Sequence, residues 1–320
     1  MDTATVGEWS RFLVGGAIAA FVVSWLAYSA ANRYALRARR AAVAGREPVL
    51  AGGAAPPAAV DAPQFAPDGV AGAARMASIG FSVAVLATSL LAAGVVARAV
   101  SVSRPPWGNM YEFSITATLV AAITFLLVAR TTVGRAVAVW VLLVLFGTLS
   151  VAVTVLYLPP GPLVPALRSY WLTLHVGAGV LAFGLFTVAA VVSALQIIAE
   201  RAQRRGATGG LTGSLPSAAT LDKVSYRLIA VAFPVWTVGP LILGAIWAEA
   251  AWGRYWGWDP KEVWALITWL AYAAFLHARA TAGWKGTKAS VVSLIAYGTV
   301  LFSYFGVNIV LTGLHSYGGL

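Results

Sequence analysis

The chain has 320 residues, of which 60% are apolar and 10% are charged, and its mean hydropathy is +0.81. Soluble domains carry about a quarter charged residues, so this composition excludes an ordinary water-soluble domain. The net charge of +11 requires no nucleic-acid partner, because basic loops orient membrane proteins and attract anionic lipid. The absence of cysteine excludes disulfides and thiol chemistry by this chain, so any sulfur must come from a partner.

Charge-free stretches close to the roughly 20 residues that cross a bilayer recur along the chain. They cover residues 12–32, 76–97, 113–129, 136–167, 169–199, 228–248, 263–278 and 289–320. Each run is continuously apolar rather than alternating with a period of two, which favours helices over a β-barrel. We therefore predict an all-α, polytopic helical bundle with about eight transmembrane helices in the plasma membrane.

The basic residues predict the orientation of these helices. With the amino terminus outside, 16 of the 22 lysines and arginines fall in inner loops and 6 fall on the outer side. The positive-inside rule then predicts that both termini are extracytoplasmic.

The amino-terminal segment is expected to divide into an anchor and a linker. Asp2 and Glu8 precede the first apolar run and most of its positive charges follow it, which is the reverse of a signal peptide. Residues 1–33 are therefore predicted to be an uncleaved transmembrane anchor. Residues 34–75, rich in Ala, Gly and Pro, are predicted to be a disordered cytoplasmic linker, and residues 76–320 one membrane domain.

Prolines predict two irregular segments further along the chain. Residues 158–169 contain four prolines and are expected to form an extended outer loop. The sixth apolar run carries Pro234 and the pair Gly239-Pro240, so a kink is expected in that helix.

Tryptophan is concentrated in and after the next loop, residues 247–262. Six of the 13 tryptophans lie between positions 247 and 269. Tryptophan favours membrane interfaces, but an aromatic belt accounts for only one or two at each helix end. The loop itself contains Trp252, Trp256 and Trp258, and such a density of flat apolar surface favours binding of a large planar ligand.

The tryptophan loop ends in Asp259-Pro260-Lys261-Glu262, which has the form of a helix start. Aspartate is a preferred N-cap, proline is favoured at the first helical position, and glutamate at the third completes a capping box. We assign Asp259 and Glu262 chiefly to this role, and a catalytic carboxylate is the less favoured interpretation.

The chain has three histidines, His175, His277 and His315. A helical histidine is usually hydrogen-bonded within its bundle, yet ionisable groups in membrane helices tend to be functional. His175 and His315 are predicted to lie at the level of the tryptophan loop, where two neutral imidazoles can ligate the iron of one porphyrin. His277 lies too deep for that iron, so it is either half of a second site or an interhelical hydrogen-bond donor.

These residues together resemble a known family. Residues 252–262 resemble the tryptophan-rich "WWD" signature of haem-handling proteins. Residues 109–113, 171–176, 306–308 and 313–317 resemble further motifs of the CcsA (ResC) family, the membrane component of System II cytochrome c biogenesis. Some actinobacterial relatives are labelled CcsB. The resemblance covers roughly residues 76–320.

The resemblance implies a site for haem b on the extracytoplasmic side. It implies that His175 and His315 are the outer axial ligands, and that His277 ligates an internal haem together with a CcsB/ResB-type partner. The haem platform would comprise Trp252, Trp256, Trp258 and Asp259. The implied reaction is thioether formation between haem and the CxxCH cysteines of apocytochrome c, a holocytochrome c synthase activity of a complex. A thioredoxin-like protein would keep those thiols reduced.

Two other functions remain open from the sequence. One is a haem transporter without ligation activity, which His277 and the kinked helix would suit. The other is a System I haem-handling protein of the CcmC or CcmF kind, which shares the tryptophan loop. A purely structural subunit is disfavoured by the density of tryptophan at one loop.

Overall fold

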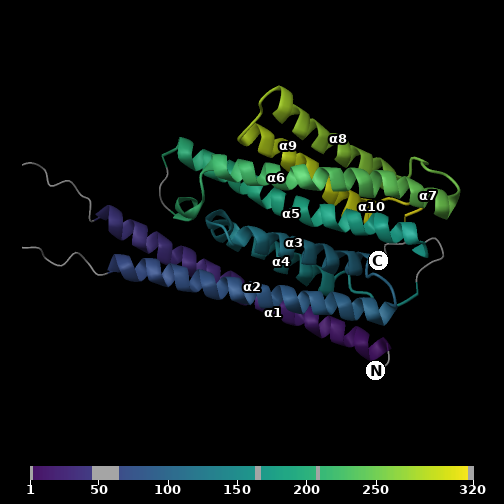
Figure 1. Cartoon of the computed structure of the whole chain (residues 1–320), viewed down its shortest axis with the longest axis horizontal. Coiled ribbons are helices and arrows are strands. Elements are labelled where there is room, and N and C mark those ends of the chain that lie inside the picture. Colours follow the sequence, from purple (N-terminus) through teal and green to yellow (C-terminus); the bar gives the residue numbers. More distant parts are fainter. Residues whose placement is uncertain (1–2, 45–64, 163–166, 207–209, 316–320) are drawn as a thin grey trace, which may run out of the picture.

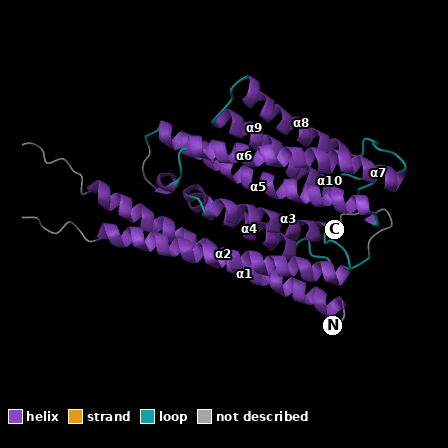
Figure 2. Cartoon of the chain, in the orientation of Figure 1, coloured by secondary structure: helices purple, strands orange, loops and turns teal. Residues whose placement is uncertain are grey.

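The computed structural model describes residues 3–44, 65–162, 167–206 and 210–315. Within these ranges the secondary structure is helical and no strand occurs (Figure 2). The helices are α1 (Thr3–Ala44), α2 (Phe65–Val102), α3 (Met110–Ala129), α4 (Thr132–Thr154), α5 (Tyr170–Arg204), η2 (Gly210–Ser214), α6 (Ala218–Trp236), η3 (Thr237–Leu243), α7 (Gly244–Trp252), α8 (Pro260–Thr281), α9 (Thr287–Leu301), η4 (Phe302–Gly306) and α10 (Val307–Val310).

These elements form eight spans that are long and apolar enough to cross a membrane, which confirms the predicted number. Two spans are composite. The sixth runs without a break from α6 through η3 to α7, and the eighth runs from α9 through η4 to α10. The beginning of α1, the α7–α8 loop and the end of α10 lie at the same end of the bundle (Figure 1).

The spans are arranged around α5, which packs against α3, α6 and α9. Phe186 of α5 stacks on Tyr272 of α8 with ring centroids 3.9 Å apart, and both side chains are buried. The indole N–H of Trp236 donates to the Ala265 carbonyl and ties α6 to α8. The core is therefore rich in aromatic contacts just below the end that carries the tryptophan loop.

The helices α1 and α2 pack along each other and form a pair at one side of the bundle (Figure 1). Small residues bring them close: a Cβ added at Gly80 would lie 2.8 Å from the Tyr28 ring. The Ser24 hydroxyl donates to the Gly80 carbonyl and the Ser10 hydroxyl to the Gly94 carbonyl, so hydrogen bonds also join the two helices.

The predicted linker was too long at both ends. α1 continues to Ala44 and α2 begins at Phe65, so residues 34–44 and 65–75 are helical. Alanine is the strongest helix former, and packing of two helices against each other stabilises both. The alanine-rich segments that were predicted to be linker can therefore be helical. The remaining part of the predicted linker, residues 45–64, lies outside the described residues.

The interruption predicted in the sixth span takes the form of a π-helical segment, η3, that contains Gly239 and Pro240. Proline has no N–H and cannot continue the regular hydrogen-bond ladder. A second π-helical segment, η4, interrupts the eighth span at Phe302–Gly306, where the sequence has no proline. Segments of this kind are frequent at functional sites.

Candidate functional site

An elongated, mostly apolar cavity lies at the end of the bundle that carries the tryptophan loop. It holds about 1170 Å³ of space between atoms, including its opening. Its walls come from the start of α3, the first turns of α5, η3 and α7, the tryptophan loop, the start of α8, and η4 with α10. Both π-helical segments therefore border the cavity, and so do His175 and His315.

His175 enters the cavity from α5. Its Nδ1 lies 3.1 Å from the Gly239 carbonyl of η3, so the ring N–H at Nδ1 donates there and the lone pair resides on Nε2. The imidazole fits because Gly244 has no side chain: a Cβ there would lie 2.9 Å from His175 Cε1. The π-helical segment thus sets both the position and the tautomer of this histidine.

His315 follows the last helix and reaches the same cavity. Its Nδ1 lies 2.6 Å from Oδ1 of Asp259, while Oδ2 of that carboxylate accepts from the Leu314 N–H at 2.6 Å. A Cβ at position 313 would lie 2.5 Å from Oδ2 of Asp259, so Gly313 is needed for this close approach. The carboxylate that begins α8 therefore also holds the carboxy-terminal segment.

The His315–Asp259 pair has a defined charge state. Burial raises the pKa of Asp259, but the hydrogen bonds from His315 and the backbone outweigh it and hold that pKa below its ordinary value. Burial lowers the pKa of His315 below 6.5, and the nearby carboxylate offsets only part of that effect. The pair is thus a carboxylate and a neutral imidazole whose Nδ1–H donates to the carboxylate, with the lone pair on Nε2.

Trp247 connects the two histidines. Its ring stacks on His175 with centroids 5.7 Å apart and an interplanar angle of 5°, and it lies 5.4 Å from the His315 ring. Trp252 packs edge-on against both Trp247 and His315, at 4.7 and 4.9 Å. The structure therefore places His175 and His315 beside one aromatic cluster, at the common level that their sequence positions predicted.

The other predicted tryptophans differ in their positions. Trp256 lines the cavity, whereas Trp258 is 70% exposed and contacts Trp256 edge-on. Trp258 also has a φ of 59°, which is unusual for a bulky residue. Trp258 therefore belongs to the outer surface of the loop and not to the cavity wall.

The loop is fixed by Glu262, whose carboxylate accepts from the Gly257 N–H at 2.8 Å and the Asp259 N–H at 3.0 Å. The predicted capping box at the start of α8 is confirmed. Arg254 pairs with Glu262 at 3.4 Å and lies over the Trp252 ring. Its guanidinium is therefore already paired with groups at the tryptophan loop.

Sequence reasoning missed two polar groups in the cavity wall. Lys261 Nζ donates to Oδ1 of Asn308 at 2.7 Å, and the Asn308 amide donates to the Tyr304 carbonyl. Lysine next to an N-cap is ordinary in sequence, and its orientation into the cavity depends on the packing of α8 against α10. No signal in the sequence distinguishes it.

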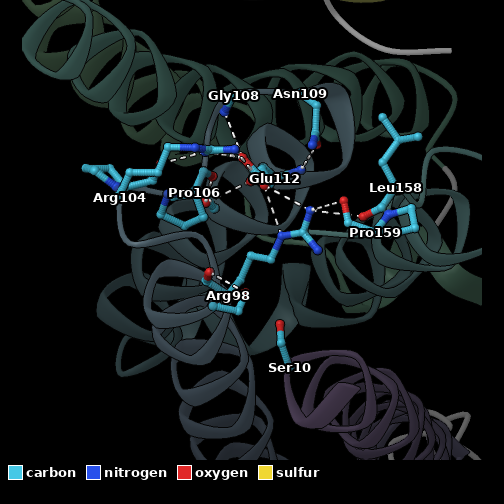
Figure 3. Close-up of polar contacts among 12 residues, drawn as sticks. Ser10, Arg98, Arg104, Pro106, Gly108, Asn109, Glu112, Leu158 and Pro159 are labelled. Carbon is cyan, nitrogen blue, oxygen red and sulfur yellow. Dashed lines mark hydrogen bonds and ion pairs between the residues drawn. The ribbon is translucent and has the colours of Figure 1, made fainter. Parts of the chain in front are cut away.

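A buried ionic cluster supports the opposite wall (Figure 3). Glu112 is fully buried and accepts from Arg98 Nε at 2.9 Å, Arg104 Nη1 at 2.6 Å and the Gly108 N–H at 2.8 Å. Arg98 also donates to the Leu158 carbonyl at 2.9 Å. The motif at residues 109–113 thus anchors the α2–α3 connection, whose Trp107 and Gly108 line the cavity.

His277 lies apart from this site. It occupies an exposed position on α8, and its ring makes no hydrogen bond within the described part of the chain. Residues 260 to 277 span roughly 25 Å of helix at 1.5 Å per residue, so His277 is remote from the cavity. Two residues on, Arg279 pairs with Asp222 of α6 at 2.7 Å and fixes this end of α8.

The fold and the site define a polytopic helical membrane protein with an aromatic, imidazole-bearing cavity at one end of its spans. The profile of the family described as cytochrome c assembly protein matches residues 107–315, which include all three histidines and the tryptophan loop. The chain belongs to this family, and within it to the CcsA family of cytochrome c biogenesis proteins.

Curated relatives named cytochrome c biogenesis protein CcsA show the extent of the similarity. The protein of Gloeobacter violaceus is 37% identical over 286 residues, which cover 71% of this chain and 82% of the relative. The protein of Synechococcus elongatus is 40% identical over 199 residues, covering 49% of this chain and 61% of the relative. That of Chlamydomonas reinhardtii is 42% identical over 157 residues, 49% of this chain and 43% of the relative. The chain thus spans less than two thirds of some of these relatives.

Proposed function

We propose that this chain acts in cytochrome c biogenesis by binding haem b in the cavity, with His175 and His315 as the two axial ligands. The observation that carries the proposal is the hydrogen bonding of the two imidazoles. Each has Nδ1 within hydrogen-bond distance of a fixed oxygen, so that Nε2 would be the nitrogen that ligates the iron. Histidines that ligate metals usually donate their other N–H to a carbonyl or carboxylate in this way.

The cavity wall suits a large planar apolar ligand. Trp107, Trp247 and Trp256 line the cavity, and Trp252 packs against Trp247 and His315 without lining it. Ligand sites are mostly apolar clefts with few, well-placed polar groups, and this cavity has that composition. Haem is a substrate here, and its vinyl groups are the reacting parts.

The proposed reaction adds each cysteine S–H of a CxxCH apocytochrome across a haem vinyl group. The sulfur bonds to one vinyl carbon and hydrogen goes to the other, so the addition needs no oxidant. This chain has no cysteine, and the thiols come from the apocytochrome, kept reduced by a thioredoxin-like partner. The contribution of this chain to a holocytochrome c synthase complex is positioning, which can supply several kcal/mol or more.

Haem delivery is the second activity that we propose. The exposed, unbonded ring of His277 favours a second, internal haem site that is completed by a residue of a CcsB/ResB-type membrane subunit. With the predicted orientation, this site lies toward the cytoplasm and the cavity lies on the extracytoplasmic side of the plasma membrane. Haem would then pass outward through the complex.

The proposal is tested by purifying the chain with its partner subunit from haem-replete cells and recording the optical spectrum. We expect a Soret band with bound b-type haem, and cytochrome c yield that falls when Trp247 is replaced by alanine. Trp258→Ala is the matched control, because Trp258 faces away from the cavity and should leave haem content unchanged. Haem-free protein with full activity would contradict the proposal.

A further inference from the structure

Lys261 is a cation in the cavity wall that forms no ion pair within the described residues, and the Asp259 carboxylate acts on it only from beyond ion-pair distance. It stands in the first turn of α8, and its ammonium donates to Oδ1 of Asn308 at 2.7 Å. An ammonium has three donors, and no second acceptor is found for it in the described ranges. No described carboxylate lies within ion-pair distance of it.

The two carboxylates next to Lys261 in sequence are engaged elsewhere. Asp259 accepts from His315 and from the Leu314 N–H, and Glu262 accepts from two loop N–H groups and Arg254. Asn308 presents its oxygen to Lys261 because its amide N–H donates to the Tyr304 carbonyl. Lys261 is partly buried in a mostly apolar cavity. An ammonium there without a paired anion is unfavourable, so this arrangement favours a negatively charged group of the ligand.

We propose that Lys261, oriented by Asn308, binds a carboxylate of the cavity's ligand. This inference rests on the proposed function, in which the carboxylate is one of the two propionates of haem. Arg254, the other cation of the tryptophan loop, is unsuitable because it is paired with Glu262 and lies over Trp252.

The consequence concerns orientation rather than affinity alone. Two axial imidazoles define an axis through the iron but leave the macrocycle free to rotate about that axis. A carboxylate held at Lys261 stops this rotation and decides which edge, and hence which vinyl groups, meet the incoming cysteines. Lys261 is therefore a positioning residue for the stereochemistry of attachment.

The test compares two probes, haem and its dimethyl ester, in optical titrations of the purified complex. Wild type should bind haem at least about 10-fold more tightly than the ester, because a charge-assisted hydrogen bond is lost in the ester. Lys261→Met should weaken haem binding to the level of the ester and leave ester affinity unchanged. Lys261→Arg, which keeps the charge, should retain the discrimination.

Lys285→Met is the matched control, since Lys285 is exposed in the loop that follows the far end of α8. Circular dichroism spectra and size-exclusion profiles are to be recorded for each variant to check that it folds. If Lys261→Met weakens both probes equally, or changes neither, the inference is overturned while the haem site stands. If wild type binds neither probe, the proposed function itself fails, and the inference with it.

Discussion

At the scale of single residues, the main finding is that Asp259 has two roles. The sequence predicted its N-cap position at the start of α8, and the capping box is present. It did not predict the 2.6 Å contact between Asp259 and His315, because those residues are separated by the whole of the seventh and eighth spans. A carboxylate behind an axial histidine makes the imidazole more basic and fixes its orientation.

Asp259→Asn should separate these two roles. Asparagine is as good an N-cap as aspartate, so helix stability should be retained, whereas Asp259→Ala should lose about 0.5–2 kcal/mol. Both variants remove the negative charge behind His315. We expect each to raise the midpoint potential of the outer haem and weaken its binding by about 10–100-fold. An unchanged potential in Asp259→Asn would show that only the cap matters.

The charge state of His315 predicts how stability depends on pH in the haem-free protein. Its pKa is lowered by burial below 6.5, so the unfolded chain takes up a proton first as pH falls from that value. The folded state therefore loses stability on acidification from about pH 7 to 5, by a few degrees in Tm. His315→Leu should reduce this dependence. The same pH dependence in wild type and in His315→Leu would contradict the assignment.

At the scale of elements, the two π-helical segments shape the cavity. The interruption at η3 was predictable from Pro234 and Gly239-Pro240, whereas η4 has no proline and gave no local signal. In η3 the Gly239 carbonyl accepts from His175, and Gly244 directly after it leaves space for the imidazole ring. Helix irregularity and ligand geometry are thus coupled in the sixth span.

Gly244→Ala tests that coupling. The new methyl group would lie 2.9 Å from His175 Cε1, which is too close, so the ring must shift. We expect haem affinity to fall about 10-fold or more, with the helix itself intact, because alanine is the better helix former. Gly147→Ala is the control, since a Cβ there meets no atom within 4 Å. Similar affinities for the two variants would rule out the proposed steric role.

The α2–α3 connection is a second element fixed by buried charge. Glu112→Gln would leave Arg98 and Arg104 without their carboxylate, and breaking a buried ion pair costs about 3–5 kcal/mol. We expect a large fall in thermal stability and a changed fluorescence of Trp107, which stands in that connection. Glu8→Gln, at an exposed position of α1, is the control, and its free energy of unfolding should stay within about 0.5 kcal/mol of wild type. Comparable stabilities would show that the cluster is dispensable.

At the scale of the whole molecule, hydropathy was sufficient to predict eight spans, because each must be apolar over its full length. The shared level of His175, His315 and the tryptophan loop followed from counting along those spans. The inward positions of Trp247 and Lys261 did not, since they depend on how distant helices pack. The exposed position of Trp258 and its positive φ are likewise not revealed by the sequence pattern.

The central claim, that His175 and His315 ligate one iron, is tested most directly by chemical rescue. Each histidine is replaced by alanine in turn, and the optical spectrum of the purified complex is recorded with and without added imidazole. We expect His175→Ala and His315→Ala both to lose the low-spin spectrum of the outer haem and to recover it with imidazole, while His277→Ala keeps it. Retention of that spectrum in His315→Ala, together with its loss in His277→Ala, would rule out His175 and His315 as the ligands of one iron.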